Sequence, residues 1–168
     1  DRTDAPGRVW HVTARVNWQE WHLDDEQAFE VFMRHLQAAA ERFSMEVLAY
    51  VVMSNHYHTI TRSPPERRYR ELTSSRSRCR HLRPYPKGSP RSNVVGQFVR
   101  RFHLATARSL QGRLGVKGHL WEEKHHRRRI MDARDLVFTM AYDHFNLCKA
   151  GMVDRPENSP RCSAAWWA

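Results

Sequence analysis

Polar and apolar positions alternate along residues 8–16, RVWHVTARV, with the two-residue period of a strand that buries one face. One set of alternate positions is apolar, and the other is mostly polar. The apolar set is Trp10, Val12, Ala14 and Val16, and the other set is Val9, His11, Thr13 and Arg15. The pattern predicts a first strand.

The period becomes helical after the acidic run Asp24-Asp25-Glu26, whose charge suits the positive end of a helix dipole. Apolar residues then recur at helical spacing as far as about Phe43, and they are Phe29, Phe32, Met33, Leu36 and Ala40. Residues 45–53, MEVLAYVVM, have strand composition, and Ser54-Asn55 supplies a turn before HYHTITRS. A helix followed by an antiparallel hairpin is therefore expected.

Residues 62–91 break the pattern, because ten Lys or Arg residues stand against two acids and prolines interrupt any helix. This segment is expected to be a basic, irregular excursion. After it, Ser92 or Asn93 can cap a second helix. The apolar stripe of that helix consists of Val95, Phe98, Val99, Phe102 and Ala105, with Arg100 and Arg101 outside the stripe.

The last two elements are a strand from Arg127 to Met131 and a helix from Asp132 to Ala150, which Gly151 ends. The order β-α-β-β-α-β-α predicts an α+β fold, a ferredoxin-like split βαβ sandwich with an antiparallel sheet and one added C-terminal helix. At 168 residues, the chain is expected to form a single domain, residues 1–168.

Charge narrows the class of partner. A formal net charge of +10 and a sequence pI near 10.2 favour a polyanion, with nucleic acid first, although a basic enzyme that binds nucleic acid nonspecifically has the same charge. Cys79, Cys148 and Cys162 lack C-x-x-C spacing, which favours a reducing compartment and argues against a thiolate zinc site. Without a membrane-length apolar run or a signal-peptide pattern in DRTDAPGR, a soluble intracellular protein is expected.

The candidate chemistry begins with His56 and His58. Residues i and i+2 of a strand point to the same face, so both imidazoles are expected to project together while Tyr57 points away. A half-exposed strand without any function can show the same pattern.

The last helix adds a phenol and an amide. On a helical wheel, one broad and nearly apolar side is expected to be the packing stripe. That side holds Leu136, Val137, Met140, Ala141, His144, Leu147 and Cys148, whereas Asp135, Thr139, Tyr142, Asp143, Asn146 and Lys149 fall on the other side. Asn146 is one turn beyond Tyr142, so their side chains share a face.

Two imidazoles, an amide oxygen and a phenol match a known phosphodiester chemistry. A divalent cation polarises a phosphate oxygen while the phenolate attacks phosphorus. A phenol is a weak acid, so Tyr142 needs help to deprotonate near neutral pH, and Lys149 and the metal are the candidates. Mixed nitrogen and oxygen ligands suit Mn²⁺ and tolerate Mg²⁺, and structural zinc is disfavoured.

Four blocks of the sequence resemble a known family. HVTARV, AYVVMSNHYHTITRSP, GHLWEEKHHRRRI and AYDHFNLCKAGMVDRPENSPRCSAAWW are similar, in this order, to the single-tyrosine transposases of the HUH superfamily. The branch that matches is the one associated with repetitive extragenic palindromes (REP). Only the part of the excursion from Arg67 to Arg91 is private to this chain.

The resemblance implies a function. Members of the family cut single-stranded DNA next to hairpins, form a 5′-phosphotyrosine link, and rejoin strands through the free 3′ hydroxyl. It implies that His56 and His58 are the HUH metal ligands, that Asn146 takes the place of the third ligand, and that Tyr142 is the nucleophile. It also implies a bacterial cytoplasmic, nucleoid-associated protein that binds single-stranded or hairpin DNA as a monomer or a homodimer.

Two positions depart from the family pattern. Asn146-Leu147 replaces the usual Asn-Pro, which is expected to shift the end of the helix slightly, and Lys149-Ala150-Gly151 replaces Arg-Ala-Gly and keeps the charge. Basic residues of the helices and the last strand are expected to contact DNA phosphates. They are Arg100, Arg101, Arg127, Arg128, Arg129 and Lys149.

Two alternatives stay open. One is a nucleic-acid-binding module of ferredoxin-like fold without catalysis, which would bind without metal and would not depend on Tyr142. The other is a metal-dependent hydrolase that uses water, in which Tyr142 would only contact the substrate. A covalent protein–DNA adduct distinguishes the three functions.

Overall fold

The computed structural model describes residues 4–17, 20, 22–73, 93–115, 118–122 and 125–167. The helices and strands are β1 (Val9–Arg15), α1 (Glu26–Phe43), β2 (Glu46–Val52), β3 (His56–Arg62), α2 (Glu66–Thr73), α3 (Val94–Leu114), β4 (His126–Ile130), α4 (Ala133–His144) and α5 (Asn146–Lys149). Two 3-10 turns follow, at Pro156–Asn158 and Ser163–Trp166.

The four strands form one antiparallel sheet in the order β2-β3-β1-β4. The hairpin β2–β3 turns at Ser54-Asn55, where the Met53 amide donates to the His56 carbonyl at 2.8 Å. Strands β1 and β3, which are far apart in the sequence, are neighbours at the centre. The expected ferredoxin-like α+β fold is therefore confirmed.

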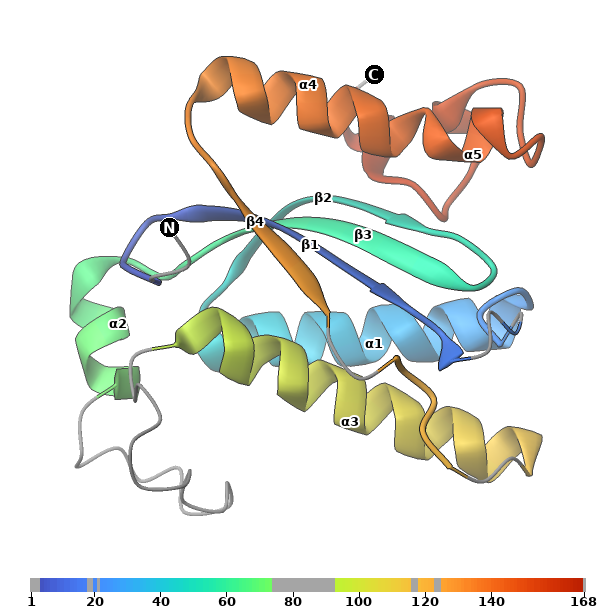
Figure 1. Ribbon diagram of the computed structural model, residues 1–168, viewed down its shortest axis with the longest axis horizontal. Helices are drawn as coiled ribbons and strands as arrows, with labels where there is room; N and C mark the ends of the chain where they lie inside the picture. Colours follow the sequence, from blue (N-terminus) through green and yellow to red (C-terminus); the bar gives the residue numbers. More distant parts are fainter. Residues whose placement is uncertain are drawn as a thin grey trace.

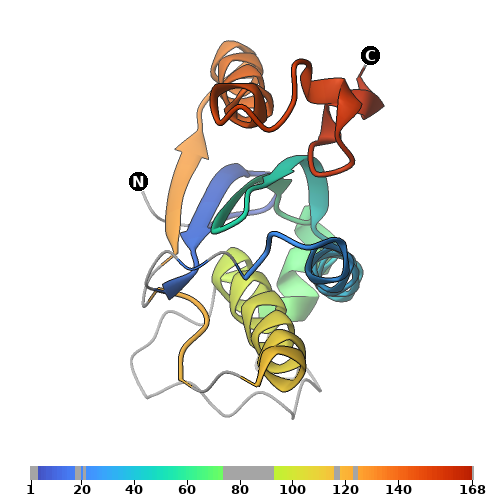
Figure 2. The same cartoon turned by 90° about the vertical axis from the view of Figure 1, so that its right-hand side faces the viewer.

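The sheet separates two layers of helices, shown in Figures 1 and 2. Helices α1 and α3 cover one face, and α4 lies across the other. The main apolar core lies under α1 and α3, where the rings of Phe32, Tyr57 and Phe102 contact one another at centroid distances of 5.0–5.3 Å. Among the described residues, no helix is long and apolar enough to cross a membrane.

Side-chain caps set the ends of the helices. Asp25 accepts from the Ala28 amide at the start of α1, and Asn93 accepts from the Gly96 amide at the start of α3, both at 2.8 Å. Gly151 has a φ of 68° after α5 and donates to Cys148, while Met152 donates to Leu147. This pair of hydrogen bonds is a Schellman motif, so the expected helix stop at Gly151 is confirmed.

Helix α2 corrects the expectation of an irregular excursion. Residues Glu66–Thr73 of this excursion form a helix directly after Pro64-Pro65. These eight residues include no proline or glycine, and their opposite charges pair along the helix. Arg70 contacts Glu66 at 2.5 Å, and the buried ring of Tyr69 anchors the helix. The rest of the excursion, residues 74–92, lies outside the described residues, as do Cys79 and Ser92.

The C-terminal tail, residues 152–167, covers the β2 edge of the sheet. Val51 and Cys162 form an antiparallel bridge, and the Val52 amide donates to the Arg161 carbonyl at 2.8 Å. The hydroxyl of Ser163 accepts from the Tyr50 amide at 2.9 Å. The tail therefore satisfies backbone groups of β2 that would otherwise form an open edge.

Candidate active site

The face of the sheet beneath α4 is polar. Opposed residues of antiparallel strands point to the same side, so the pairing of Thr13 with His58 and of His11 with Arg128 puts these four side chains on one face. The other face of β1 carries Trp10 and the rest of its apolar set, as the alternation predicted.

His56 and His58 project to this polar face, as expected for i and i+2, and their rings lie 5.3 Å apart. Tyr57 points into the core, where its hydroxyl lies 2.6 Å from Nε2 of His103. Nδ1 of His56 lies 2.7 Å from the side-chain oxygen of Asn55. Burial, helped by His58 and Arg15, lowers the pKa of His56 to about 4, so its imidazole is neutral at pH 7.

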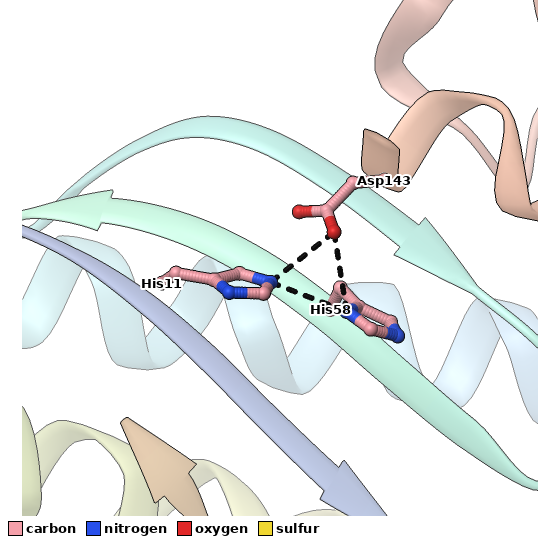
Figure 3. Close-up of side chains that lie close together, drawn as sticks. All are labelled: His11, His58 and Asp143. Carbon is pink, nitrogen blue, oxygen red and sulfur yellow. Dashed lines mark hydrogen bonds and ion pairs between the residues drawn. The ribbon is translucent and has the colours of Figure 1, made fainter. Parts of the chain in front are cut away.

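His11, His58 and Asp143 form a tight triangle, shown in Figure 3. Nε2 of His11, Nδ1 of His58 and Oδ1 of Asp143 lie 3.2 Å from one another. The Asp143 side chain is fully buried. Burial alone raises the pKa of this carboxyl, but the contacts with His11 and His58 outweigh it and hold the pKa below its usual range. The carboxylate is therefore ionised between two imidazoles.

The triangle allows two chemical uses. Two imidazoles and one carboxylate are a donor set that binds divalent transition metals, and the three atoms are close enough to share one ion. Alternatively, Asp143 fixes the orientation of His58 through Nδ1 and leaves Nε2 of His58 available beside His56. Both oxygens of Asp143 are buried without a well-aligned hydrogen bond among the described residues, so the site is polar and incomplete.

Helix α4 is rotated about its axis from the orientation that the helical wheel predicted, so only part of the predicted packing stripe faces the sheet. Thr139 and Asp143, expected on the outer side, are buried against the sheet, whereas Val137, expected in the packing stripe, is 64% exposed. The reason is that the sheet beneath α4 presents imidazole and guanidinium groups, so polar residues of the helix pair with them. Only Leu136 and Met140 of the predicted stripe pack against the small apolar cluster of Ala49, Ile60 and Ile130.

Tyr142 is half exposed, at the border between the buried and outer sides of α4. Its ring centroid lies 6.4 Å from that of His58, and Nζ of Lys149 lies 4.5 Å from the Tyr142 ring centroid. A pocket of about 330 Å³ opens beside it, and its lining residues are His11, Arg128, Asp135, Phe138, Thr139 and Tyr142. The phenol is thus accessible and close to one of the two predicted histidines.

Asn146 begins α5, after the helix is interrupted at Phe145. The structure does not bring its side chain into hydrogen-bond contact with His56 or His58. Its Nδ2 is buried and has no partner among the described residues. A half-turn of the amide exchanges its nitrogen and oxygen, so the buried atom can be either of the two.

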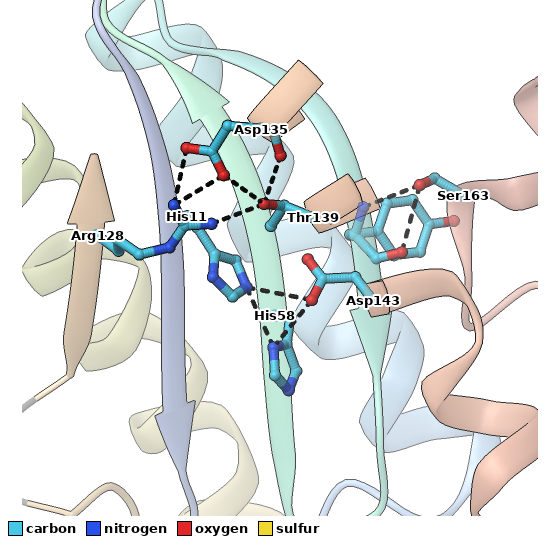
Figure 4. Close-up of polar contacts among 8 residues, drawn as sticks. His11, His58, Arg128, Asp135, Thr139, Asp143 and Ser163 are labelled. Carbon is cyan, nitrogen blue, oxygen red and sulfur yellow. Dashed lines mark hydrogen bonds and ion pairs between the residues drawn. The ribbon is translucent and has the colours of Figure 1, made fainter. Parts of the chain in front are cut away.

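The predicted DNA-binding arginines do not share one surface. Arg128 faces α4 and donates to Asp135 at 2.8 and 2.9 Å and to Thr139 at 2.6 Å, as Figure 4 shows. Arg127 points the other way and donates to Asn93 at 2.5 Å. Arg129 alternates to the same side as Arg127. Arg100 and Arg101 are exposed on α3, across the sheet from Tyr142.

Sequence reasoning missed two residues of the site, His11 and Asp143. In the ferredoxin-like strand order β1 adjoins β3, so polar residues on alternate positions of these two strands share a face. His11 could have been found in this way. Asp143 directly follows Tyr142, and the wheel assigned it to solvent because the polarity of the sheet beneath was unknown.

Comparison with solved structures supports the fold. A structure of a REP-associated tyrosine transposase bound to a REP hairpin superposes with a TM-score of 0.63 at 17% sequence identity, over 97% of this chain and 80% of that one. The chain has the fold of that transposase. A transposase candidate from Deinococcus radiodurans R1 matches with a TM-score of 0.49 at 16% identity, over 84% of this chain and 92% of the other.

No protein-family model matches the chain, and no curated protein matches it. The similarity at this level of identity establishes the fold and leaves the activity to be argued from the residues of the site.

Proposed function

We propose that this protein is a transposase-like, metal-dependent endonuclease and strand transferase of the HUH type that acts on single-stranded DNA next to hairpins. The observation that carries the proposal is the half-exposed phenol of Tyr142 beside His58, over a polar sheet face that also presents His56. The fold is shared with a transposase whose structure contains a REP hairpin, which supports hairpin DNA as the partner.

The residues that would hold the metal are His56 and His58, each through Nε2, with the amide oxygen of Asn146 as the third ligand. The fit is supported by the Nδ1 contacts of both imidazoles, with Asn55 for His56 and with Asp143 for His58, because metal-binding histidines commonly anchor the second nitrogen on an oxygen. When bound, Mg²⁺ or Mn²⁺ would polarise a non-bridging phosphate oxygen and offset the negative charge that develops on the phosphate oxygens.

The chain's own residues supply the nucleophile. The Tyr142 oxygen gives up its proton to solvent and attacks phosphorus, with Nζ of Lys149 4.5 Å from the centre of its ring. A bond forms between the phenolic oxygen and the 5′ phosphate, and the bond from phosphorus to the 3′ oxygen breaks. The 3′ oxygen takes up a proton and leaves as a hydroxyl. The reaction runs in reverse when the 3′ hydroxyl of another strand attacks the phosphotyrosine, which joins the two strands and releases Tyr142.

A covalent adduct tests the proposal. End-labelled hairpin DNA with a single-stranded flank is mixed with the protein and Mn²⁺ or Mg²⁺, and the products are separated on a denaturing gel. The parent should give a slower protein–DNA band, and Tyr142→Phe should lose the band while retaining DNA binding, because only the phenolic oxygen is removed. Excess chelator should also remove the band.

The matched control is Tyr69→Phe, which removes a phenolic oxygen far from the polar face and should leave the adduct unchanged. Cleavage without an adduct would show that water is the attacking group. Binding without cleavage under any metal would show a non-catalytic binding module instead.

A further inference from the structure

Five residues form a strip along the outer side of α4 and α5, here called the aromatic strip: Arg134, Phe138, Tyr142, Phe145 and Lys149. At about 100° per residue, all five fall within an arc of about 80°. The helical path continues through the interruption, because Phe145 donates to Ala141 and Lys149 donates to Phe145, each at 3.0 Å. The strip is therefore one continuous surface.

The three rings of the strip are unusually exposed. Phe138 is 62% exposed, and Tyr142 and Phe145 are each 53% exposed. A run of exposed aromatic rings on one helix face marks an interaction surface rather than part of a core. The strip is also continuous with the candidate active site, because Phe138 and Tyr142 line the pocket whose other wall holds His11 and Arg128.

Cations flank the rings, and acids lie elsewhere. The guanidinium carbon of Arg134 lies 5.5 Å from the Phe138 ring centroid, and Nζ of Lys149 lies 4.5 Å from that of Tyr142. The acids Asp135 and Asp143 point toward the sheet, where Asp135 pairs with Arg128. A row of aromatic rings between two cations suits a single-stranded nucleic acid, whose bases stack and whose phosphates are anionic.

We propose that the aromatic strip is the track for unpaired DNA on either side of the cut, with one base stacked on Phe138 and another on Phe145. This inference rests on the proposed function and extends it by naming where the strand runs. Tyr142, between the two platforms, then meets the phosphate that joins the stacked nucleotides. The cations leave the ring faces for the flanking phosphates when bases arrive.

A second copy of the chain is a poorer occupant of the strip. In a two-fold interface, each strip would face itself with the helices antiparallel, which brings Arg134 of one copy toward Lys149 of the other. Like charges at both ends oppose that pairing, whereas a phosphate backbone neutralises them.

A double-mutant cycle between rings and bases tests the track. The affinity of the parent and of Phe138→Ala/Phe145→Ala is measured by fluorescence anisotropy, in chelator, for labelled oligothymidylate and for the same backbone with abasic spacers. On the normal strand, the double variant should bind more weakly than the parent, by roughly tenfold for each of its two substitutions. On the abasic strand, the parent and the double variant should bind equally weakly, because no base remains to stack.

Val137→Ala is the matched control, because Val137 is also an exposed apolar residue of α4 but lies outside the strip. It should bind both strands like the parent. Phe138→Leu keeps apolar area and removes the ring, so it should lose affinity nearly as Phe138→Ala does. All variants are checked by thermal unfolding, and their changes are at exposed positions.

Equal affinity of the parent and the double variant for oligothymidylate would overturn the track, as would the same loss on both strands. A fall in sedimentation mass of the double variant with unchanged DNA affinity would assign the strip to a second copy. The binding measurement is independent of DNA cutting. A base-dependent loss of affinity without a covalent adduct would refute the cleavage proposal alone. An adduct without a base-dependent loss of affinity would refute the track alone.

Discussion

The two nitrogens of His58 have different surroundings. Nδ1 faces Asp143 and His11 at 3.2 Å, so only Nε2 can act together with His56. We therefore expect Asp143 to position His58 rather than to bind the metal itself. An oxygen behind a histidine ligand commonly changes metal affinity by an order of magnitude or more without being a ligand.

Replacing Asp143 by asparagine separates these roles. Asp143→Asn keeps the size of the side chain and removes its charge, so we expect Mn²⁺ affinity to fall about 10- to 100-fold, with binding still measurable by calorimetry. His56→Ala should abolish binding. The opposite result would be loss of Mn²⁺ binding in Asp143→Asn and in His11→Ala, with binding unchanged in His56→Ala. That result would assign the ion to the triangle of His11, His58 and Asp143.

A second histidine is held neutral inside the core. His103 stacks on Trp121 at a centroid distance of 4.4 Å and lies 2.6 Å from the Tyr57 hydroxyl. Burial, with a smaller effect of His125, lowers the pKa of His103 to about 3. In the unfolded chain the imidazole titrates near pH 6.5. The unfolded state therefore binds more protons between these two values, and stability falls as the pH is lowered through this range.

The expected outcome is a lower urea midpoint at pH 4.5 than at pH 7, with a smaller pH effect in His103→Phe. His103→Phe loses the contact with Tyr57 and is expected to be less stable at pH 7, so the comparison uses the change in unfolding free energy between the two pH values. The same change in the variant and the parent would show that His103 does not dominate the acid response.

Arg128 joins two elements, β4 and α4. Its guanidinium donates to both oxygens of Asp135 and to the hydroxyl of Thr139, in two successive turns of the helix. A two-armed guanidinium contact fixes orientation better than a point charge does. We therefore expect Arg128 to hold the helix that carries Tyr142 over the sheet.

Arg128→Lys keeps the charge and loses the second arm. Adduct formation should slow several-fold, while hairpin DNA affinity and its salt dependence stay close to those of the parent. Arg101→Lys, on the opposite layer, is the control for a lysine substitution in general. Loss of DNA affinity in Arg128→Lys with an unchanged rate of cleavage would restore the earlier prediction that Arg128 contacts phosphate.

Elements differ in how well the sequence predicts them. The strands β1, β2 and β3 and helices α1 and α3 follow from their periods, because each buries apolar residues in the main core. Strand β4 has no residue in that core, and only its Ile130 is buried, in the small cluster on the other face. Helix α4 was also expected from its sequence, but its orientation was not, because it packs on a sheet face whose polarity depends on strand neighbours. The same cause explains which site residues could be predicted. His56, His58 and Tyr142 are found from local spacing alone. His11 requires knowledge that β1 pairs with β3, and Asp143 requires knowledge of which side of α4 faces the sheet.

At the scale of the whole molecule, positive charge is spread over both layers. Arg100 and Arg101 are exposed on α3, and Arg134 and Lys149 are exposed on α4 and α5, across the sheet from α3. With a net charge of +10, DNA should meet favourable potential from either side. Affinity is then expected to depend steeply on salt, whereas sequence preference is carried by fewer contacts near the site.

Titration of salt at fixed single-stranded DNA measures this dependence. The slope of log affinity against log salt should be about −0.7 for each phosphate neutralised, and Arg134→Gln and Lys149→Gln should each reduce its magnitude by about that amount. Arg128→Gln should leave the slope unchanged, because Asp135 already neutralises that guanidinium. A flat dependence in the parent would mean that the positive charge does not serve DNA binding.

The two layers of the sandwich are held by very different amounts of apolar contact. Helix α4 has no residue in the main core, and small clusters around Ile60 and Leu147 hold α4, α5 and the tail to the sheet. We therefore expect the layer of α4, α5 and the tail to open as a cooperative unit while the layer of α1 and α3 stays folded, as in a local unfolding event. Amide exchange is then expected to be faster in α4 than in β1 and β3. Under the proposed function, lifting this layer would widen the access of hairpin DNA to the pocket beside Tyr142.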